Sequence, residues 1–256
     1  MHFRKMHGLG NDFVILDFRE KSETLTIERI QQICDRNFGV GCDLLTVLEP
    51  SENADLFARF YNADGSESAA CGNATRCVAD IVMRGQSSEA CNIETGRGIL
   101  ECTRAENDMV TVNMGAPLEI KDIPSPGHML PSAISVNVGN PHCVFFVDEL
   151  DGKKIRVLGP MVENMTEVFP EKTNVEFVQV INEGKIRQRT WERGVGVTLA
   201  CGSGACAVAA AGVHTARTSR KVEIILDGGS LFIEQRDDEA LMMTGPVAYV
   251  FDGELK

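Results

Sequence analysis

The sequence contains no long apolar segment, no cluster of basic residues and no apolar core near its first residues. The longest apolar stretches, such as 205–213, are too short to cross a bilayer, so we expect no membrane-spanning segment. Residues 1–12, MHFRKMHGLGND, lack the apolar core of a signal peptide, which predicts a cytoplasmic protein. The net charge is −12, from 25 basic and 37 acidic residues. Without a basic patch, such a chain is unsuited to binding nucleic acid or an anionic membrane.

Cysteine is present but not in the patterns of a disulfide framework or a zinc knuckle. Nine cysteines, an odd number, in a chain without an export signal predict reduced thiols. Cys71 and Cys77 are spaced more widely than a C-x2-4-C knuckle, so we expect no metal site. A free cysteine usually behaves as a small buried hydrophobe, and we predict this for seven of the nine. These seven are Cys34, Cys42, Cys77, Cys91, Cys102, Cys143 and Cys206.

Periodicity predicts many strands and few helices. Helices are expected at 26–37, at 72–85 and directly after Cys201, where the apolar residues recur at helical spacing or alanine dominates. Alternating apolar residues predict strands in both halves of the chain. The predicted strands are 13–18, 44–49, 56–62, 99–105, 109–115, 133–139, 143–149, 174–181 and 186–192, with three or four more within 221–253.

The two halves of the chain repeat one organisation. A proline-rich stretch, 115–132, is predicted to be an irregular connection between them. Each half combines many strands with one helix that begins at Cys-Gly, which predicts a duplicated α+β unit with a pseudo-twofold relation. We expect one domain to comprise 1–116 together with a C-terminal strand at 248–256, and the other to comprise 117–247.

The two Cys-Gly helix starts, SAACGNATRC and TLACGSGAC, place Cys71 and Cys201 in the same local setting. The first N–H groups of a helix lack intrahelical partners and carry partial positive charge, so we expect a lowered thiol pKa at both positions. The small residues that follow allow a carboxylate to approach these N–H groups. Two opposed thiols suit a reaction in which one removes a proton from a carbon and the other protonates its opposite face.

Seven motifs occur in order along nearly the full chain. They are MHGLGNDF (6–13), GVGCD (39–43), FYNADGSESAACGNATRC (60–77), VNVGNPHCVFFV (136–147), TNVEFV (173–178), ERGVGVTLACGSGACA (192–207) and MTGPVAYVFDG (243–253). Together they resemble the diaminopimelate epimerase family, racemases that work without pyridoxal phosphate.

The resemblance implies two similar α/β halves, each a strongly curved, barrel-like sheet around a central helix, with the active site in the cleft between them. It implies inversion of one α-carbon of LL-2,6-diaminopimelate to give the meso form, on the route to lysine and peptidoglycan. The substrate would be a small amino acid, Cys71 and Cys201 would be the acid/base pair, and no cofactor would be needed. It also suggests a homodimer formed through the C-terminal segment around Phe251.

The resemblance further implies a polar clamp for a substrate with two amino-acid ends. Four asparagines would supply neutral donors and acceptors. These are Asn11, Asn62, Asn140 and Asn174. Arg193 would bind the carboxylate at the non-reacting end, Glu192 would hold the reacting ammonium group, and His142 would be a secondary participant near the thiols.

At both helix starts, the resemblance implies backbone N–H groups around the reacting carboxylate. The residues concerned are Gly72, Asn73, Gly202 and Ser203. Simpler interpretations stay open for some of the other site residues. Asn62 and Asn140 are also typical of turns, and an isolated His142 is more often a structural hydrogen-bonding residue.

Three positions depart from the family pattern. Leu44 stands where glutamine is usual, Val197 replaces a glutamate, and Ala74 replaces a glycine. The first two leave open a racemase of the same fold acting on another amino acid, such as proline or hydroxyproline. The related isomerase fold of phenazine biosynthesis lacks the cysteine pair and fits less well. A thiol redox or metal-binding module is the non-enzymatic alternative, but it leaves Glu192 and Arg193 unexplained.

Overall fold

The computed structural model describes residues 1–21, 23–125 and 130–256, which form two compact units. Unit 1 comprises Met1–Val112 and Gly245–Lys256, and unit 2 comprises Asn113–Thr244. Each unit combines a sheet with two α-helices, which confirms the mixed α+β fold. None of the described helices is long and apolar enough to span a lipid bilayer.

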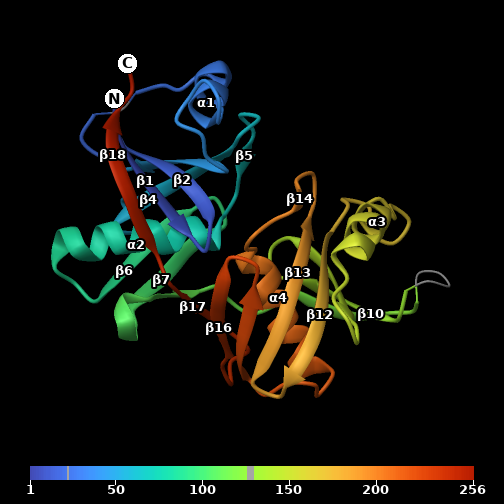
Figure 1. The fold of residues 1–256 in the computed structure, drawn as a ribbon. Helices are drawn as coiled ribbons and strands as arrows, with labels where there is room; N and C mark the ends of the chain where they lie inside the picture. Colours follow the sequence, from blue (N-terminus) through green and yellow to red (C-terminus); the bar gives the residue numbers. More distant parts are fainter. Residues whose placement is uncertain (22, 126–129) are drawn as a thin grey trace. The chain divides into compact units, whose positions relative to one another are not determined.

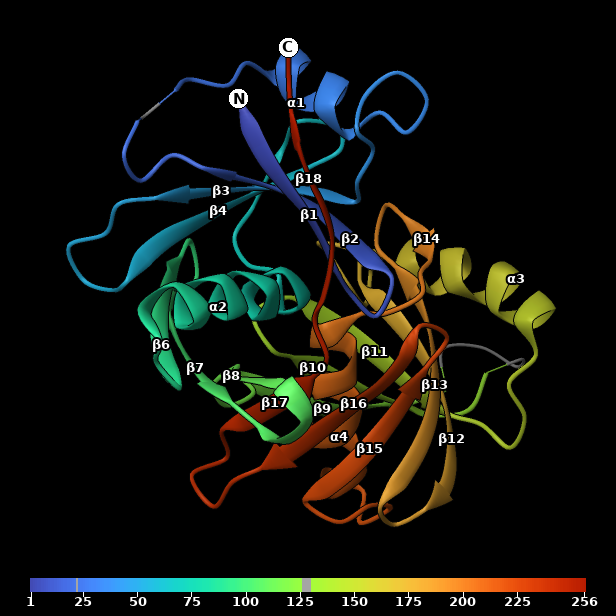
Figure 2. The ribbon, with the colours of Figure 1, turned by 60° about the vertical axis from the view of Figure 1, so that its left-hand side comes forward.

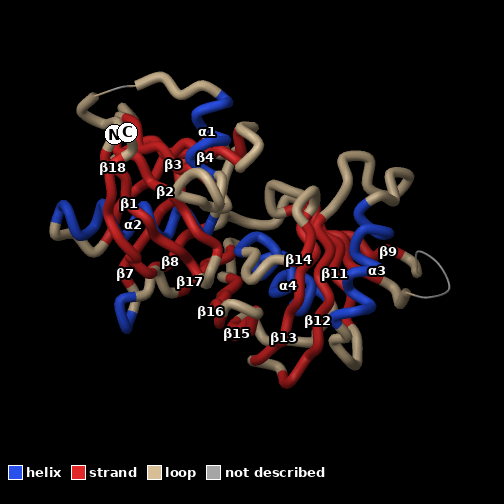
Figure 3. The backbone as a smooth tube through the Cα atoms, turned by 45° about the horizontal axis from the view of Figure 1, so that its top comes forward, coloured by secondary structure: helices blue, strands red, loops and turns tan. Residues whose placement is uncertain are grey.

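Unit 1 is built on one sheet to which both ends of the chain contribute. Its strands are β1 (His2–Gly8), β2 (Asn11–Asp17), β3 (Leu44–Glu49), β4 (Leu56–Asn62), β5 (Glu67–Ser68), β6 (Ala90–Thr95), β7 (Gly98–Arg104), β8 (Val110–Asn113) and β18 (Ala248–Glu254). Their order is β18-β1-β2-β3-β4-β6-β7-β8, with β5 paired to β4. The N-terminal ammonium of Met1 donates to the Leu255 carbonyl at 2.9 Å, so the two chain ends lie together (Figure 3).

The helices of unit 1 are α1 (Ile27–Cys34) and α2 (Gly72–Gln86), with a 3-10 turn at Glu106–Asp108. The helix α2 contacts β1, β2, β6 and β7, which lie in separate parts of the strand order, so the sheet curls around it (Figure 1). The helix α1 packs its buried face against apolar residues of β1, β2 and β3. It begins at the N-cap Thr26, as expected, and ends at Cys34 rather than at residue 37.

Unit 2 is built from the same kinds of element as unit 1, a sheet and two α-helices. Its strands are β9 (Glu119–Ile123), β10 (Ala133–Asn137), β11 (Pro141–Phe146), β12 (Asn174–Asn182), β13 (Lys185–Glu192), β14 (Gly196–Val197), β15 (Lys221–Leu226), β16 (Gly229–Gln235) and β17 (Leu241–Gly245). Its helices are α3 (Gly152–Glu163) and α4 (Gly202–His214). The helix α4 contacts β10, β11, β12, β15 and β16, and Figure 2 shows these strands around it.

The connectivity of the two units confirms the predicted duplication. The order in unit 2 is β9-β10-β11-β12-β13-β15-β16-β17, and along it the parallel pairings fall at the same places as in unit 1. In unit 1 these are β2–β3 and β4–β6, and in unit 2 they are β11–β12 and β13–β15. The helices α1 and α3 connect equivalent strands, as do α2 and α4.

Two local predictions were wrong. The stretch 115–132 is not wholly irregular, because it contains β9, which pairs antiparallel with β10; residues 126–129 lie outside the described part. The helix α3 was not expected, because Gly152, Gly159 and Pro160 interrupt its pattern. Packing of Ile155 and Val162 against the unit 2 core stabilises it despite those residues.

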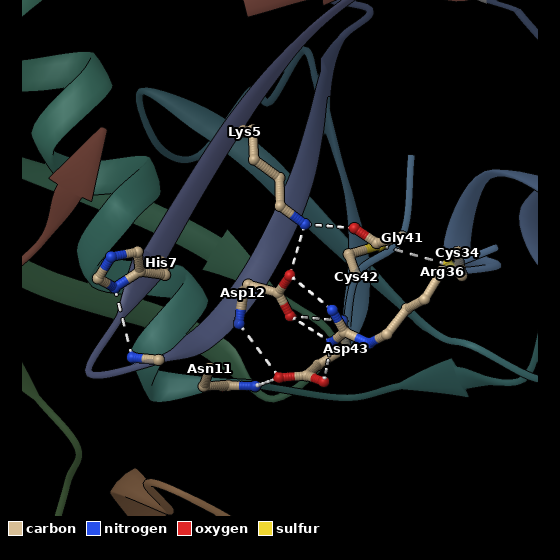
Figure 4. Close-up of polar contacts among 10 residues, drawn as sticks. Lys5, His7, Asn11, Asp12, Cys34, Arg36, Gly41, Cys42 and Asp43 are labelled. Atoms are coloured by element: carbon tan, nitrogen blue, oxygen red, sulfur yellow. Dashed lines mark hydrogen bonds and ion pairs between the residues drawn. The ribbon is translucent and has the colours of Figure 1, made fainter. Parts of the chain in front are cut away.

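A charged network joins β1, β2 and the loop that follows α1 (Figure 4). Asp12 accepts hydrogen bonds from Lys5 Nζ at 2.5 Å and from Arg36 Nη2 at 2.7 Å. Arg36 Nη2 also donates to Asp43 Oδ1 at 2.6 Å, and Asp43 Oδ2 accepts from the Asn11 side-chain amide at 2.9 Å. Burial alone would raise the pKa of Asp12, but the hydrogen bonds from Arg36 and Lys5 outweigh it and lower the pKa to about 2.

We predict that Asp12→Asn lowers stability in a pH-dependent way. Because the folded-state pKa of Asp12 is depressed, its contribution is present above the unfolded-state pKa of about 3.9 and is lost as the pH falls toward 2. In urea unfolding, the difference in unfolding free energy between wild type and variant should shrink by about 1 kcal/mol between about pH 5 and pH 3. The exposed Asp237→Asn is the control, and a pH-independent difference for Asp12→Asn would contradict the prediction.

Candidate active site

Cys71 is the N-cap of α2, as the sequence predicts. Its backbone is extended, and its carbonyl accepts the first intrahelical hydrogen bond, from Thr75 N at 2.8 Å. The side chain is partly exposed, and its Sγ lies 3.9 Å from Asn11 Oδ1. The helix start therefore presents a thiol that is open to a ligand on one side and contacts an amide carbonyl on the other.

Asn11 and Asn73 form the polar surroundings of this thiol. Asn73 Nδ2 donates to Asn11 Oδ1 at 3.2 Å, while the Asn11 amide nitrogen donates to Asp43. Both ends of the Asn11 amide are thus held, with the carbonyl directed toward Cys71. Asp43 was not expected to be a functional residue, although it ends the GVGCD motif.

Asn62 and Leu44 lie side by side on neighbouring strands of unit 1. They are register partners of β4 and β3, and Leu44 also pairs with Phe13 of β2. The Asn62 amide donates to Ser66 Oγ at 3.0 Å across the turn between β4 and β5. This bond supports the simpler interpretation of Asn62 as a turn residue, and a direct contact with substrate stays a prediction.

Cys201 is the N-cap of α4 and has a more enclosed environment. Its Sγ accepts a hydrogen bond from Gly204 N at 3.3 Å and lies 3.5 Å from Ser203 Oγ. The residue is only 6% exposed. The predicted helix-start geometry is therefore present in both units, with one partly exposed and one buried thiol.

The expectation of a lowered pKa was wrong for Cys201. Burial raises the pKa of the thiol well above its ordinary value, and the negative charges of Glu192 and Glu176 raise it further. Hydrogen bonds from Ser203 and Gly204 N act in the opposite direction but do not prevail. At this buried helix start, removal from water and two carboxylates outweigh the hydrogen bonds that would stabilise a thiolate.

A chain of polar contacts leads from Glu176 to the Cys201 thiol. Glu176 Oε1 lies 2.8 Å from His142 Nδ1, and His142 Nε2 lies 3.1 Å from Asn140 Oδ1. The Asn140 amide donates to Ser203 Oγ at 3.4 Å, and Ser203 reaches Cys201. Four of the site residues expected from the sequence therefore lie together: His142, Asn140, Ser203 and Cys201. Glu176 was missed, although a glutamate inside the buried strand segment NVEFV was a signal.

A further set of polar contacts in unit 2 involves three more of the expected site residues, Asn174, Glu192 and Arg193. The Asn174 side chain accepts from Arg193 N at 2.9 Å and donates to the Pro141 carbonyl at 3.1 Å. Glu192 accepts a hydrogen bond from Thr198. The Arg193 guanidinium is exposed, donates to a backbone carbonyl and forms no salt bridge with a described carboxylate. It is therefore available to an anionic ligand.

The other residues expected at the site lie at the two helix starts. Gly72 and Asn73 form the first turn of α2, and Gly202 and Ser203 form the first turn of α4. Val197, one of the three departures from the family pattern, packs against the apolar core of unit 2. All seven cysteines assigned to packing are buried. No group of three or more potential metal ligands occurs among the described residues.

Solved structures with low sequence identity define the fold class of this chain. A phenazine biosynthesis protein from Bacillus anthracis has a TM-score of 0.75 at 16% identity, over 100% of this chain and 99% of that chain. A probable proline racemase from Agrobacterium radiobacter has a TM-score of 0.73 at 14% identity, over 100% and 92%. The chain thus has the α+β fold of these proteins.

Sequence relatives define the family. A diaminopimelate epimerase from Rhodospirillum centenum is 46% identical over 267 residues, covering 99% of this chain and 91% of the relative. One from Acidiphilium cryptum is 43% identical over 265 residues, covering 99% and 95%. The family model described as diaminopimelate epimerase matches residues 3–119 and 134–250. The chain belongs to the diaminopimelate epimerase family, which confirms the resemblance seen in its motifs.

We predict that Cys201 titrates as a thiol of raised pKa. The pH of half-maximal alkylation by iodoacetamide should lie above the value for a free cysteine, about 8.5. Glu192→Gln should lower this pH, because it removes a charge that disfavours the thiolate. Peptide mass spectrometry measures the alkylation rate at each cysteine separately. Equal midpoints in folded and urea-unfolded protein would contradict the prediction.

Proposed function

We propose that the protein is a cofactor-independent isomerase that epimerises LL-2,6-diaminopimelate to the meso form. Membership of the diaminopimelate epimerase family supports this substrate. The observation that carries the proposal is that both units of a duplicated fold place a thiol at the start of the enclosed helix, at Cys71 and Cys201. The meso product would serve lysine and peptidoglycan synthesis.

In the proposed reaction, the two cysteines act on opposite faces of one α-carbon. In one direction Cys71, as thiolate, removes the proton, and Cys201, as thiol, donates a proton to the other face; the reverse reaction exchanges these roles. The raised pKa of Cys201 supports its function as the acid in the first case. A single base would tend to return its proton to the original face. Proton exchange with solvent restores the starting state after each turnover.

The remaining site residues would bind the substrate and stabilise its charge. As the α-proton leaves, negative charge spreads to the adjacent carboxylate, which the first N–H groups of α2 and α4 would stabilise. These belong to Gly72, Asn73, Gly202 and Ser203. Glu192 would bind the ammonium group, and the exposed Arg193 would bind the distal carboxylate. Asn11, Asn140 and Asn174 would orient these ends, with His142 beside them.

We predict that Cys71→Ala and Cys201→Ala each abolish epimerisation, because each removes one partner of the proton transfer. Loss of an acid or base group should reduce the rate by at least about a hundredfold. The measurement is deuterium incorporation from heavy water into LL-diaminopimelate, followed by mass spectrometry and chiral separation. Cys91→Ala, which changes a buried cysteine outside the site, is the matched control.

The same assay tests substrate identity, which Leu44 and Val197 make an open question. Proline and hydroxyproline are the comparison substrates. Faster exchange into either than into diaminopimelate would overturn the proposed substrate but keep the mechanism. Substantial turnover in both cysteine variants would overturn the mechanism itself.

We also propose that the protein is cytoplasmic and forms a homodimer through β18. Tyr249, Val250 and Phe251 are 58%, 47% and 43% exposed, and adjacent exposed apolar side chains are typical of an interaction surface. Sedimentation velocity should show a dimer for the wild type and a monomer for Val250→Asp, because the interface would bury a charge. Phe38→Asp, at another exposed position of unit 1, should remain dimeric. A monomeric wild type would contradict the proposal.

A further inference from the structure

Glu176 is a buried carboxylate that unit 2 keeps at an energetic cost. The residue is 0% exposed, and only its Oε1 has a polar partner, the His142 ring. Among the described residues, no protein group donates a hydrogen bond to Oε2. A buried ionised group with an unpaired oxygen destabilises a fold, so a function of this carboxylate explains its presence better than packing does.

The carboxylate lies directly behind the start of α4. A Cβ atom built at Gly204 would lie 2.7 Å from Glu176 Oε1 and 3.2 Å from Cys201 Sγ. Only glycine at this position allows the strand carboxylate and the thiol to approach the same point of the helix. Glu176 on β12 and Glu192 at the end of β13 are the two anionic groups that raise the pKa of the thiol electrostatically.

The same carboxylate also orients the His142 ring, through the contact with its Nδ1. An ionised carboxylate only accepts, so in the contact with Glu176 Oε1 the ring nitrogen Nδ1 is the donor. His142 Nε2 lies 3.1 Å from Asn140 Oδ1, and Asn140 and Ser203 continue the contacts to the thiol. One buried charge therefore acts on the helix start both directly and through a chain of oriented side chains.

We propose that Glu176 is a positioning residue for the reaction: it fixes the His142 ring and, from its place behind α4, favours the protonated form of Cys201. This inference rests on the proposed function, since a protonated Cys201 is the acid of the epimerisation. Besides Glu176, the thiol faces Glu192 of β13 and the first turn of α4, while His142 of β11 meets it only through Asn140 and Ser203. In this proposal Glu176 acts through these neighbours and not by contact with the substrate.

The first test is Glu176→Gln, which preserves shape and a hydrogen-bond acceptor but removes the charge. The pH of half-maximal alkylation of Cys201 should fall by about one unit, because a nearby like charge is gone. The alkaline limb of the kcat/KM profile for LL-diaminopimelate should move to lower pH with it. We expect kcat to fall about tenfold with little change in KM, as for other residues that orient a histidine. Glu223→Gln, a carboxylate on β15 bound to Lys185, is the matched control and should change none of these values.

The second test uses the wild-type protein and does not depend on a variant that folds. Histidine nitrogen chemical shifts should show that His142 Nδ1 carries a proton at neutral pH. An unprotonated Nδ1, or an unchanged alkylation midpoint in Glu176→Gln, would overturn the inference. The alkylation measurement needs no turnover, so it tests Glu176 even if diaminopimelate is not the substrate. Failure of the wild type to exchange deuterium would overturn the proposed function alone.

Discussion

The structure depends on a helix that is enclosed by its own sheet in each unit. Because α2 and α4 contact strands from distant parts of the strand order, their sides are used for packing, as the buried Cys77 and Cys206 illustrate. The first turn is then the part of each helix where backbone N–H groups remain available to a ligand. A cysteine at that one position places a thiol beside these N–H groups. The duplicated connectivity produces this combination twice.

The two thiols nevertheless differ in their surroundings. Cys71 is partly exposed and contacts a neutral amide, whereas Cys201 is buried near two carboxylates. A duplicated fold therefore carries two thiols in unequal surroundings. In the proposed reaction, this difference would favour Cys201 as the protonated partner.

The sequence was most informative where a local rule determines the structure. The helix starts at Cys71 and Cys201 follow from glycine and alanine composition, and the burial of the other cysteines follows from their apolar character. The helix α3 could not be predicted, because tertiary packing outweighs its glycine and proline content. The raised pKa of Cys201 could not be predicted either. It depends on burial and on the charges of Glu192 and Glu176, and strand pairing rather than sequence proximity brings Glu176 to the helix.

The pairing of β18 with β1 has a consequence for the order of events during synthesis. Unit 2 is a continuous segment, Asn113–Thr244, and all of its residues are made before the last strand of unit 1. The hydrogen bond from the Met1 ammonium group to the Leu255 carbonyl can form only after Leu255 has been made. Unit 1 therefore keeps one edge of β1 unpaired until β18 has been made. A truncated chain that ends at residue 244 should thus contain every strand of unit 2 up to β17 and a unit 1 that lacks its closing strand.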